Sequence, residues 1–205
     1  MTNSAKQFSQ KRKKEYYYKE SKKHQIRARS YFKLEQINKK YEILKDGINI
    51  IDLGCAPGGW LEYLDRTLNQ ANIIGIDLLE VKNQKEFSKN IKIIEDDFNN
   101  IEEYINKENN EYFDLIISDM APEFSGNSGL DKGRTHKLNL KTIEFAKKYL
   151  KKRGNLLFKS FEGEDLEFVR NQAKKIFKEV KEYKPKSSQK KSAEVFELCF
   201  FKKET

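Results

Sequence analysis

The sequence predicts an α/β protein whose mostly parallel sheet carries helices on both faces. Short apolar runs alternate with longer segments in which apolar residues recur at helical spacing, from about residue 30 to the C-terminus. Several of the runs end in a charged residue, and a glycine-rich turn follows the first of them. Strands that alternate with helices indicate parallel pairing through helical crossovers. In such sheets ligands bind beyond the carboxyl ends of the strands, so we expect the functional site there.

The first half of the chain predicts two helices and three strands. Apolar residues at helical spacing over 30–45 predict the first helix, with Ser30 as its candidate N-cap. The run 48–54 predicts a buried strand, and Gly58 and Gly59 open the second helix. The other two strands of this half are 72–79, ending at Asp77, and 91–98, ending near Asp96 and Asp97.

The second half continues the alternation and closes with a pair of strands. In chain order we expect a short helix over 100–107, a strand over 112–122 that ends at Asp119, a helix over 135–151, a strand over 154–160 and a helix over 164–178. The segments 179–185 and 193–203 predict a final antiparallel pair.

Charged side chains gather at the predicted carboxyl ends of the strands. One acid at such a place is ordinary turn chemistry. Several charged groups at one edge of a parallel sheet instead indicate a functional edge. The charged residues at these ends are Asp52, Asp77, Asp97, Asp119 and Lys159.

The positive charge of the chain is concentrated at its N-terminus. The formal net charge is +9, and residues 1–33 account for all of it, with eleven Lys or Arg and two acids. Tyrosines are interleaved with these bases. Bases that neutralise phosphates and rings that stack on unpaired bases predict a nucleic-acid-binding arm. The alternative is a solvated, lysine-rich tail. We expect a basic, partly flexible arm over 1–28 and a single domain over 29–205.

Composition excludes several classes of protein. The only cysteines, Cys55 and Cys199, are too few for a disulfide framework or a zinc site. The two histidines, His24 and His136, have no metal-ligand partner at useful spacing, so we expect no metal. No apolar run is long enough for a membrane span, and the N-terminus has no secretory signal pattern. We therefore expect a cytoplasmic protein with no membrane partner.

The glycine-rich turn "DLGCAPGGW", residues 52–60, is a candidate cofactor loop. Glycines allow a ligand to approach the backbone, and the following helix offers free N–H groups. The spacing fits neither GxGxxG nor a P-loop. Asp77, at the end of the second strand, is placed to accept hydrogen bonds from a ribose, and Asp97 with Phe98 to hold an adenine. The glycine-rich turn, together with the acids at these strand ends, predicts a nucleoside cofactor, either NAD or S-adenosylmethionine (SAM).

Five motifs resemble those of the FtsJ/RrmJ-type SAM-dependent RNA ribose 2′-O-methyltransferases. They are "SYFKL" (30–34), "DLGCAPGGW", "SDMAP" (118–122), "FKSFEG" (158–163) and "SAEVF" (192–196), in this order. The resemblance implies SAM as the cofactor. It also implies a Rossmann-like methyltransferase fold, with a seven-stranded sheet whose last strand is antiparallel.

The resemblance also implies which residues form the site. The family has a Lys-Asp-Lys-Glu tetrad around the reacting ribose, and the matching positions are Lys33, Asp119, Lys159 and Glu194. The implied cofactor contacts are Gly54, Pro57, Gly58, Gly59, Trp60, Asp77, Asp97, Phe98 and Asp119. The glycine-containing segment 121–135 is expected to be a loop beside the substrate.

Methyl transfer from a sulfonium to a hydroxyl needs in-line alignment and removal of the hydroxyl proton. Lys159 is the candidate base. Burial and the neighbouring Lys33 favour its neutral form, and the two acids of the tetrad oppose it. The alternative is that Lys159 extends its ammonium to solvent from a strand end.

The resemblance predicts a monomeric enzyme that acts on RNA, with a uridine ribose of large-subunit ribosomal RNA as the target. The tRNA anticodon loop is the alternative substrate. Two other classes stay open: a catalytically silent RNA-binding or ribosome-assembly factor, and a nicotinamide-dependent oxidoreductase, which should show the GxGxxG that this chain lacks.

Overall fold

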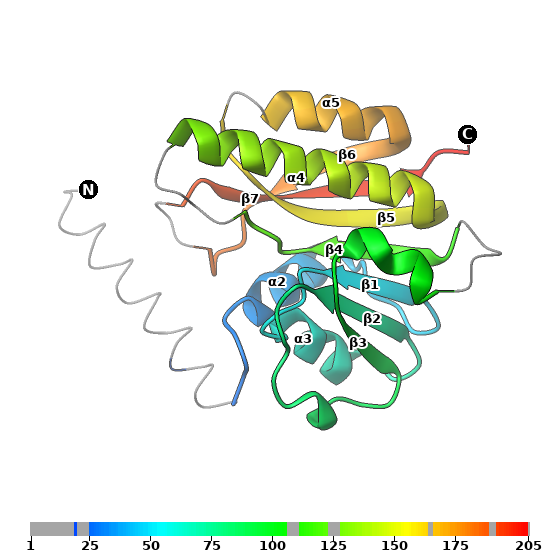
Figure 1. The fold of residues 1–205 in the computed structure, drawn as a ribbon. Helices are drawn as coiled ribbons and strands as arrows, with labels where there is room; N and C mark the ends of the chain where they lie inside the picture. Colours follow the sequence, from blue (N-terminus) through cyan, green and yellow to red (C-terminus); the bar gives the residue numbers. More distant parts are fainter. Residues whose placement is uncertain are drawn as a thin grey trace.

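A computed structural model describes residues 19, 25–105, 111–122, 128–163, 166–188 and 192–204. It contains one seven-stranded sheet, as predicted (Figure 1). The strands are β1 (Asn49–Leu53), β2 (Asn72–Asp77), β3 (Ile91–Glu95), β4 (Phe113–Ser118), β5 (Leu150–Phe161), β6 (Phe177–Tyr183) and β7 (Glu194–Lys202). Their spatial order is β3-β2-β1-β4-β5-β7-β6.

The strand directions confirm a mostly parallel sheet with an antiparallel last strand. Neighbouring strands from β3 to β5 are all parallel, whereas β7 lies antiparallel between β5 and β6. The carboxyl ends of β1 to β5 therefore lie on one edge of the sheet. The first residue of β7 reaches the same edge, because Glu194 pairs with Phe161 at the end of β5.

Helices cover both faces of the sheet and bury two separate cores (Figure 1). Successive residues of a strand point to opposite faces. Thus Ile50 of β1 packs in the core with α2 and α3, and Ile51 in the core with α4 and α5. Burial on both faces explains why the strands are continuous apolar runs. The helices are α2 (Tyr31–Tyr41), α3 (Gly59–Thr67), α4 (Ser128–Tyr149) and α5 (Leu166–Ile176).

The structure corrects two predictions about the elements. The expected short helix over 100–107 is the 3-10 helix η2 (Phe98–Glu103), capped by the Asp97 carboxylate, which accepts a hydrogen bond from Asn99 N at 2.9 Å. α4 begins at Ser128, so 128–135 is helical rather than part of a loop. The glycines in this segment lower its helix propensity. Once the following residues are packed as a helix, however, each added residue gains one hydrogen bond, so the helix extends through the glycines. The rest of the expected loop, 123–127, lies outside the described residues.

The described end of the basic arm contacts the loop that follows β2. The guanidinium of Arg27 donates to the carbonyls of Lys82 and Asn83 at 2.7 and 3.0 Å and pairs with Glu86 at 2.6 Å. It also lies over the Phe87 ring, 4.4 Å from its centroid. Residues 1–18 and 20–24 of the predicted arm lie outside the described residues. No helix in the described parts of the chain is long and apolar enough to span a membrane.

A buried ion pair joins α5 to β7. Glu197 of β7 is fully buried, and the Arg170 guanidinium donates to both of its carboxylate oxygens at 2.8 to 3.1 Å. Burial raises the pKa of Glu197, and the attraction of Arg170 only partly offsets this effect. A carboxylate in this position is costly without its partner.

Replacing Arg170 by alanine is expected to destabilise the fold by about 3 kcal/mol at pH 8. The loss should be smaller at pH 5, because the pKa of an unpaired Glu197 rises further and the carboxyl becomes neutral. A carboxyl with a raised folded-state pKa gives stability that is lost as pH rises through that pKa. Urea unfolding at the two pH values measures the difference. The control is Lys174→Ala, since the Lys174–Glu167 pair on the same helix is exposed. Equal losses at both pH values would contradict the role assigned to Glu197.

Candidate active site

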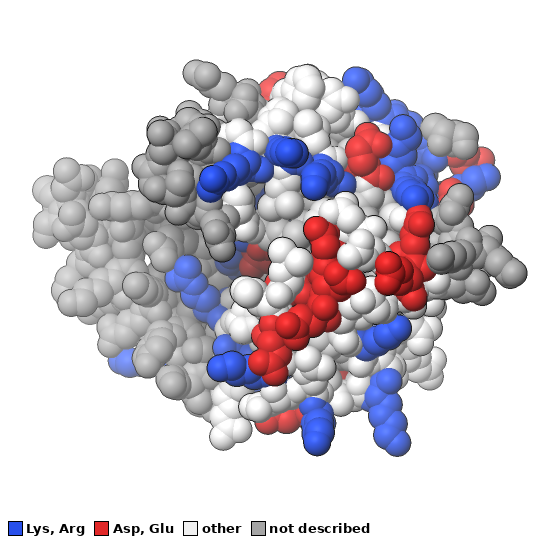
Figure 2. All heavy atoms as spheres, in the orientation of Figure 1, with Lys and Arg blue, Asp and Glu red and all other residues white. Residues whose placement is uncertain are grey.

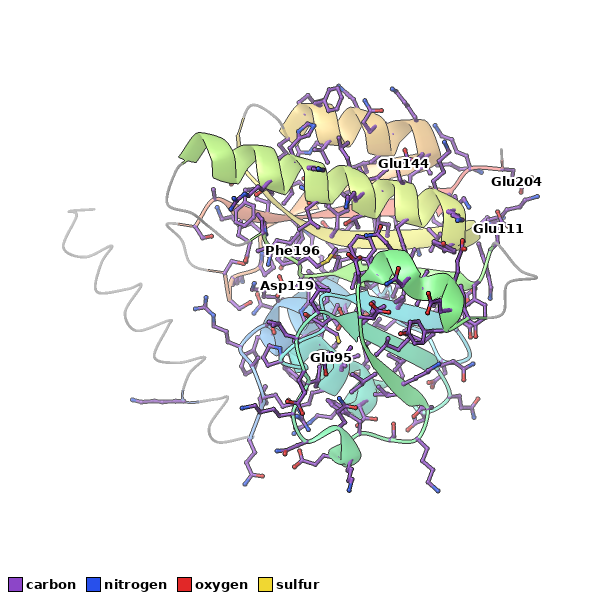
Figure 3. All side chains as sticks on the ribbon, in the orientation of Figure 1. Glu95, Glu111, Asp119, Glu144, Phe196 and Glu204 are labelled. Atoms are coloured by element: carbon purple, nitrogen blue, oxygen red, sulfur yellow. The ribbon has the colours of Figure 1, made fainter. Side chains whose placement is uncertain are left out.

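The four tetrad residues predicted from sequence meet at the carboxyl edge of the sheet. Lys33 Nζ lies 2.8 Å from Glu194 Oε2 and 3.4 Å from Asp119 Oδ1. Lys159 Nζ lies 3.0 Å from the same Asp119 oxygen and also donates to the Asp119 backbone carbonyl. Asp119 thus contacts both lysines. Figure 3 labels Asp119 and Phe196, which lie close together. The Lys33 ammonium lies over the Phe196 ring, 5.5 Å from its centroid.

Strand alternation explains how Lys159 reaches the cluster. In β5, Leu157 packs in the core with α2 and α3, and Phe158 in the opposite core. Lys159 therefore points to the α2 side, where it pairs across the ladder with Phe196 of β7. It is 9% exposed, so it does not extend to solvent from the strand end.

Trp60 fixes the helix that carries Lys33. Its indole N–H donates to the Ser30 carbonyl at 2.9 Å, directly before α2 begins. Ser30 occupies the N-cap position as predicted, but its side chain makes no cap hydrogen bond. Because Trp60 is buried and packs near Phe196, its visible role is to hold α2 against the sheet. Its contact with a cofactor stays a prediction.

Glu194 balances the charge of Lys33. Burial raises its pKa, but the attraction and hydrogen bond of Lys33, with a hydrogen bond from Ser188 Oγ at 2.7 Å, outweigh this and leave the pKa below its ordinary value. Glu194 is therefore ionised at neutral pH. The tetrad thus combines two basic and two acidic side chains, whose formal charges sum to zero.

The glycine-rich loop closes around the end of β1. Gly54 has φ +74° and donates to the Ile76 carbonyl at 2.8 Å, and a Cβ placed there would lie 2.3 Å from Met120 Cγ. Gly58, with φ +102°, is the N-cap of α3, and Gly59 is its first residue. Pro57, directly before Gly58, follows a cis peptide bond. Only glycine fits such close, left-handed positions without strain.

Asp77 connects this loop to β2. One carboxylate oxygen accepts from Ala56 N at 2.8 Å and the other from Leu79 N at 2.9 Å. A carboxylate has about four acceptor sites, so both oxygens keep capacity for the hydroxyls of a ribose. Leu78 and Leu79, directly after Asp77, are 70% and 68% exposed. This exposed apolar surface was not predicted from the sequence, although two leucines directly after a strand end indicate it.

The predicted adenine residues follow β3 beside Asp77. Asp96 N donates to the Asp77 carbonyl at 2.9 Å, which places Asp97 and Phe98 next to the loop. Phe98 is half-buried, and its ring packs edge-on against Phe145 of α4. Both residues therefore already have structural roles, the cap of η2 and this ring contact. Their contact with an adenine stays a prediction.

Asp52 is a further candidate site residue, one that was not among the cofactor contacts predicted from the sequence. It is 1% exposed, and neither carboxylate oxygen has a hydrogen-bond partner within the described part of the chain. Burial, and then repulsion by Asp119 and Asp77, raise its pKa well above the ordinary value. Buried polar groups are nearly always paired, so this one indicates a partner supplied by a ligand. Its place at the end of the first apolar run was the available signal.

Three carboxylates around Gly54 suit a cationic ligand. Asp52, Asp77 and Asp119 interact electrostatically, and no basic side chain hydrogen-bonds to Asp52 or Asp77 in the described residues. SAM carries a sulfonium and an ammonium, which fit this set. The pyrophosphate of NAD would be repelled by it. Among the described residues no cluster of three or more His, Cys, Asp or Glu could hold a metal.

Known proteins that are similar to this chain over most of its length are methyltransferases. The model of the FtsJ-like methyltransferase family matches residues 26–202. The ribosomal RNA large subunit methyltransferase E of Pelagibacter ubique is 37% identical over 197 residues, which is 95% of each chain. The protein of the same name from Methanocaldococcus jannaschii is 38% identical, over 92% of this chain and 78% of its own length.

Solved structures share the fold. A ribosomal RNA methyltransferase from Plasmodium falciparum is 26% identical with a TM-score of 0.74, over 86% of this chain and 98% of its own. Fibrillarin from Aeropyrum pernix, solved with bound SAM, is 15% identical with a TM-score of 0.58, over 76% and 67%, and shows the fold alone. The family model covers most of the chain, and close relatives cover nearly all of it. The chain belongs to the FtsJ-like methyltransferase family.

Proposed function

We propose that this methyltransferase transfers a methyl group from SAM to a ribose 2′-hydroxyl of RNA, at a uridine of large-subunit ribosomal RNA. The observation that carries the proposal is the cluster of the four tetrad residues, in which Asp119 contacts both lysines and Glu194 contacts Lys33, beside the unpaired Asp52. A catalytically silent RNA-binding factor has no need of this buried set of charges. The names of the relatives support ribosomal RNA over the tRNA anticodon loop.

When bound, SAM supplies a methyl group activated by its sulfonium and leaves as a neutral thioether. The residues that would hold it are Asp52 for the ammonium, Asp77 for the ribose hydroxyls, and the backbone of Gly54 and Gly58. Asp119 belongs to the tetrad and also interacts electrostatically with Asp52 beside the loop. It would therefore orient the amine of Lys159 and attract the positive charge of the cofactor.

In this proposal Lys159 accepts the proton of the 2′-hydroxyl. A neutral amine has two N–H groups and one lone pair. In the structure Lys159 Nζ has two acceptors, the backbone carbonyl and one carboxylate oxygen of Asp119. A neutral Lys159 would therefore use both N–H groups on Asp119 and keep its lone pair for the hydroxyl proton. Removal of that proton would free the ribose oxygen to form its bond to the methyl carbon, with the neutral thioether as the leaving group. Lys33 and Glu194 position the ribose.

Removing the amine of Lys159 is expected to lower the rate of methyl transfer by about 10²- to 10⁴-fold, the usual contribution of a general base. Lys159→Ala and Lys159→Arg should both show the loss, since a guanidinium does not give up its proton. Transfer of a labelled methyl group to unmodified large-subunit ribosomal RNA measures it.

The matched control is Lys151→Ala, which removes a lysine from the opposite end of β5, where it pairs with Asp114. That protein should keep its rate. Isothermal calorimetry with SAM checks that the cofactor still binds to each variant. Full turnover by Lys159→Arg would exclude the assignment.

Changing Asp52 to asparagine should have opposite effects on stability and on cofactor affinity. Without cofactor, the melting temperature should rise at pH 8, because the buried, unpaired carboxyl with its raised pKa is gone. The direction of the change follows from linkage. A carboxyl whose folded-state pKa is raised stabilises the fold at low pH, and this stability is lost as pH rises through the folded-state pKa. SAM affinity should fall by about tenfold or more, since hydrogen bonds to charged groups are the strong ones.

Differential scanning fluorimetry and calorimetry measure these two effects. Asp114→Asn is the control, because that carboxylate lies at the start of β4, away from the loop. NAD should give no heat with any variant. Unchanged SAM affinity in Asp52→Asn would show that Asp52 has no role toward the cofactor.

A further inference from the structure

An exposed aromatic pair lies outside the site described above. Phe168, in the first turn of α5, is 50% exposed, and the ring of His136 from α4 stacks on it with centroids 5.1 Å apart and planes at 30°. Other large exposed apolar residues of the described chain are Leu78 and Leu79 beside the cofactor loop, and Phe201 near the end of β7. Because His136 covers one face of the Phe168 ring, the exposed part is left for another flat group.

The pair lies on the edge of the sheet that carries the tetrad. Asn139 of α4 donates to Ser160 Oγ at 2.8 Å, and Ser160 follows Lys159 in β5. α4 runs back from the carboxyl edge to the start of β5, so His136, one turn before Asn139, lies nearer that edge. Phe168 lies early in α5, which follows the end of β5. The pair is thus on the α4–α5 face, opposite the face that carries Lys33 and Arg27.

Basic side chains accompany the aromatic pair. Arg134, Lys137 and Lys141 are exposed and recur at i, i+3 and i+7, which places them on one stripe of α4. Figure 2 shows a row of Lys and Arg side chains over this helix, and the larger group of acidic side chains lies below it. We call these three residues the α4 stripe. Its charge is complementary to a phosphate backbone.

We propose that the Phe168–His136 pair is a stacking platform for an unpaired RNA base that flanks the methylated nucleotide, with the α4 stripe holding the adjoining phosphates. The inference rests on the proposed function. Ribosomal RNA presented to the tetrad would then extend across the sheet edge from the Lys33 face to the α4–α5 face. A protein partner would more often meet a contiguous apolar patch, whereas here the exposed apolar group is a single ring, with exposed basic side chains on the neighbouring helix α4.

Three substitutions of Phe168 separate stacking from other roles. Phe168→Ala should weaken binding of a single-stranded fragment of large-subunit ribosomal RNA by about fivefold or more, which is the usual effect of losing one base–aromatic stack. Phe168→Leu should lose nearly as much, because it keeps apolar area but no ring. Phe168→Trp should keep affinity, and its fluorescence should be quenched by the RNA, since Trp60, the natural tryptophan, is buried.

The matched control is Phe201→Ala, which removes another exposed phenylalanine, 43% exposed, at the far end of β7 from the tetrad. RNA affinity is measured by fluorescence anisotropy with a labelled oligonucleotide, and KM and kcat by methyl transfer. The effect of Phe168→Ala should fall on RNA affinity and KM, with SAM affinity unchanged. Melting temperatures check that each variant is folded under the assay conditions.

The outcomes distinguish this inference from the proposed function. If the unaltered protein does not methylate ribosomal RNA, the proposed function is wrong and the platform with it. If it does, and Phe168→Ala matches Phe201→Ala in RNA affinity, only the platform is excluded. Wild-type RNA affinity in Phe168→Leu would also overturn the proposal, because it would mean that apolar contact alone suffices, as at a protein interface.

Discussion

The site depends on one constraint: two lysine ammonium groups are held close together in a largely buried place. Lys33 and Lys159 both contact the same oxygen of Asp119, and without acids between them they would repel each other strongly. Asp119 and Glu194 bring the charge of the cluster to zero, which makes its burial tolerable. The four residues come from α2, from the end of β4, from β5 and from β7. The cluster therefore forms only when the strand order and the packing of α2 are both correct.

A second group of charges lies beside the first and is not balanced. Asp52, Asp77 and Asp119 surround the glycine loop, and Asp52 has no hydrogen-bond partner in the described chain. An ionised Asp52 is unfavourable in the free protein, which is why its pKa is raised, and it becomes favourable when a cation binds. Functional sites often retain such locally unfavourable groups, which the rest of the fold compensates. Along this edge of the sheet, acidic side chains thus lie at the predicted cofactor loop, and basic side chains lie toward the proposed RNA.

Most of the fold and the tetrad could be predicted from the sequence, for different reasons. Buried parallel strands leave apolar runs, so all seven strands were located from residue pattern. The tetrad required motif resemblance, because no spacing rule connects Lys33 to Glu194 over the length of the chain. The start of α4 was not predicted, because the glycines in its first turns lower helix propensity. The helix extends through them from its second half, which is packed against the sheet. The partnerless state of Asp52 was not predictable either, because it depends on which side chains surround it in three dimensions.

Charge conservation during the proposed reaction gives Asp119 a role beyond orientation. In the proposed reaction the bound methyl donor would bring a positive charge near Asp119 while Lys159 is neutral. After transfer the donor would be neutral and Lys159 would carry the proton taken from the hydroxyl. The carboxylate would thus have one adjacent positive charge from these two groups at both stages, so the positive charge would move only between two neighbours of the same anion. A site fixed in advance around such an anion needs little reorganisation as the charge moves, which is the main source of electrostatic catalysis in enzymes.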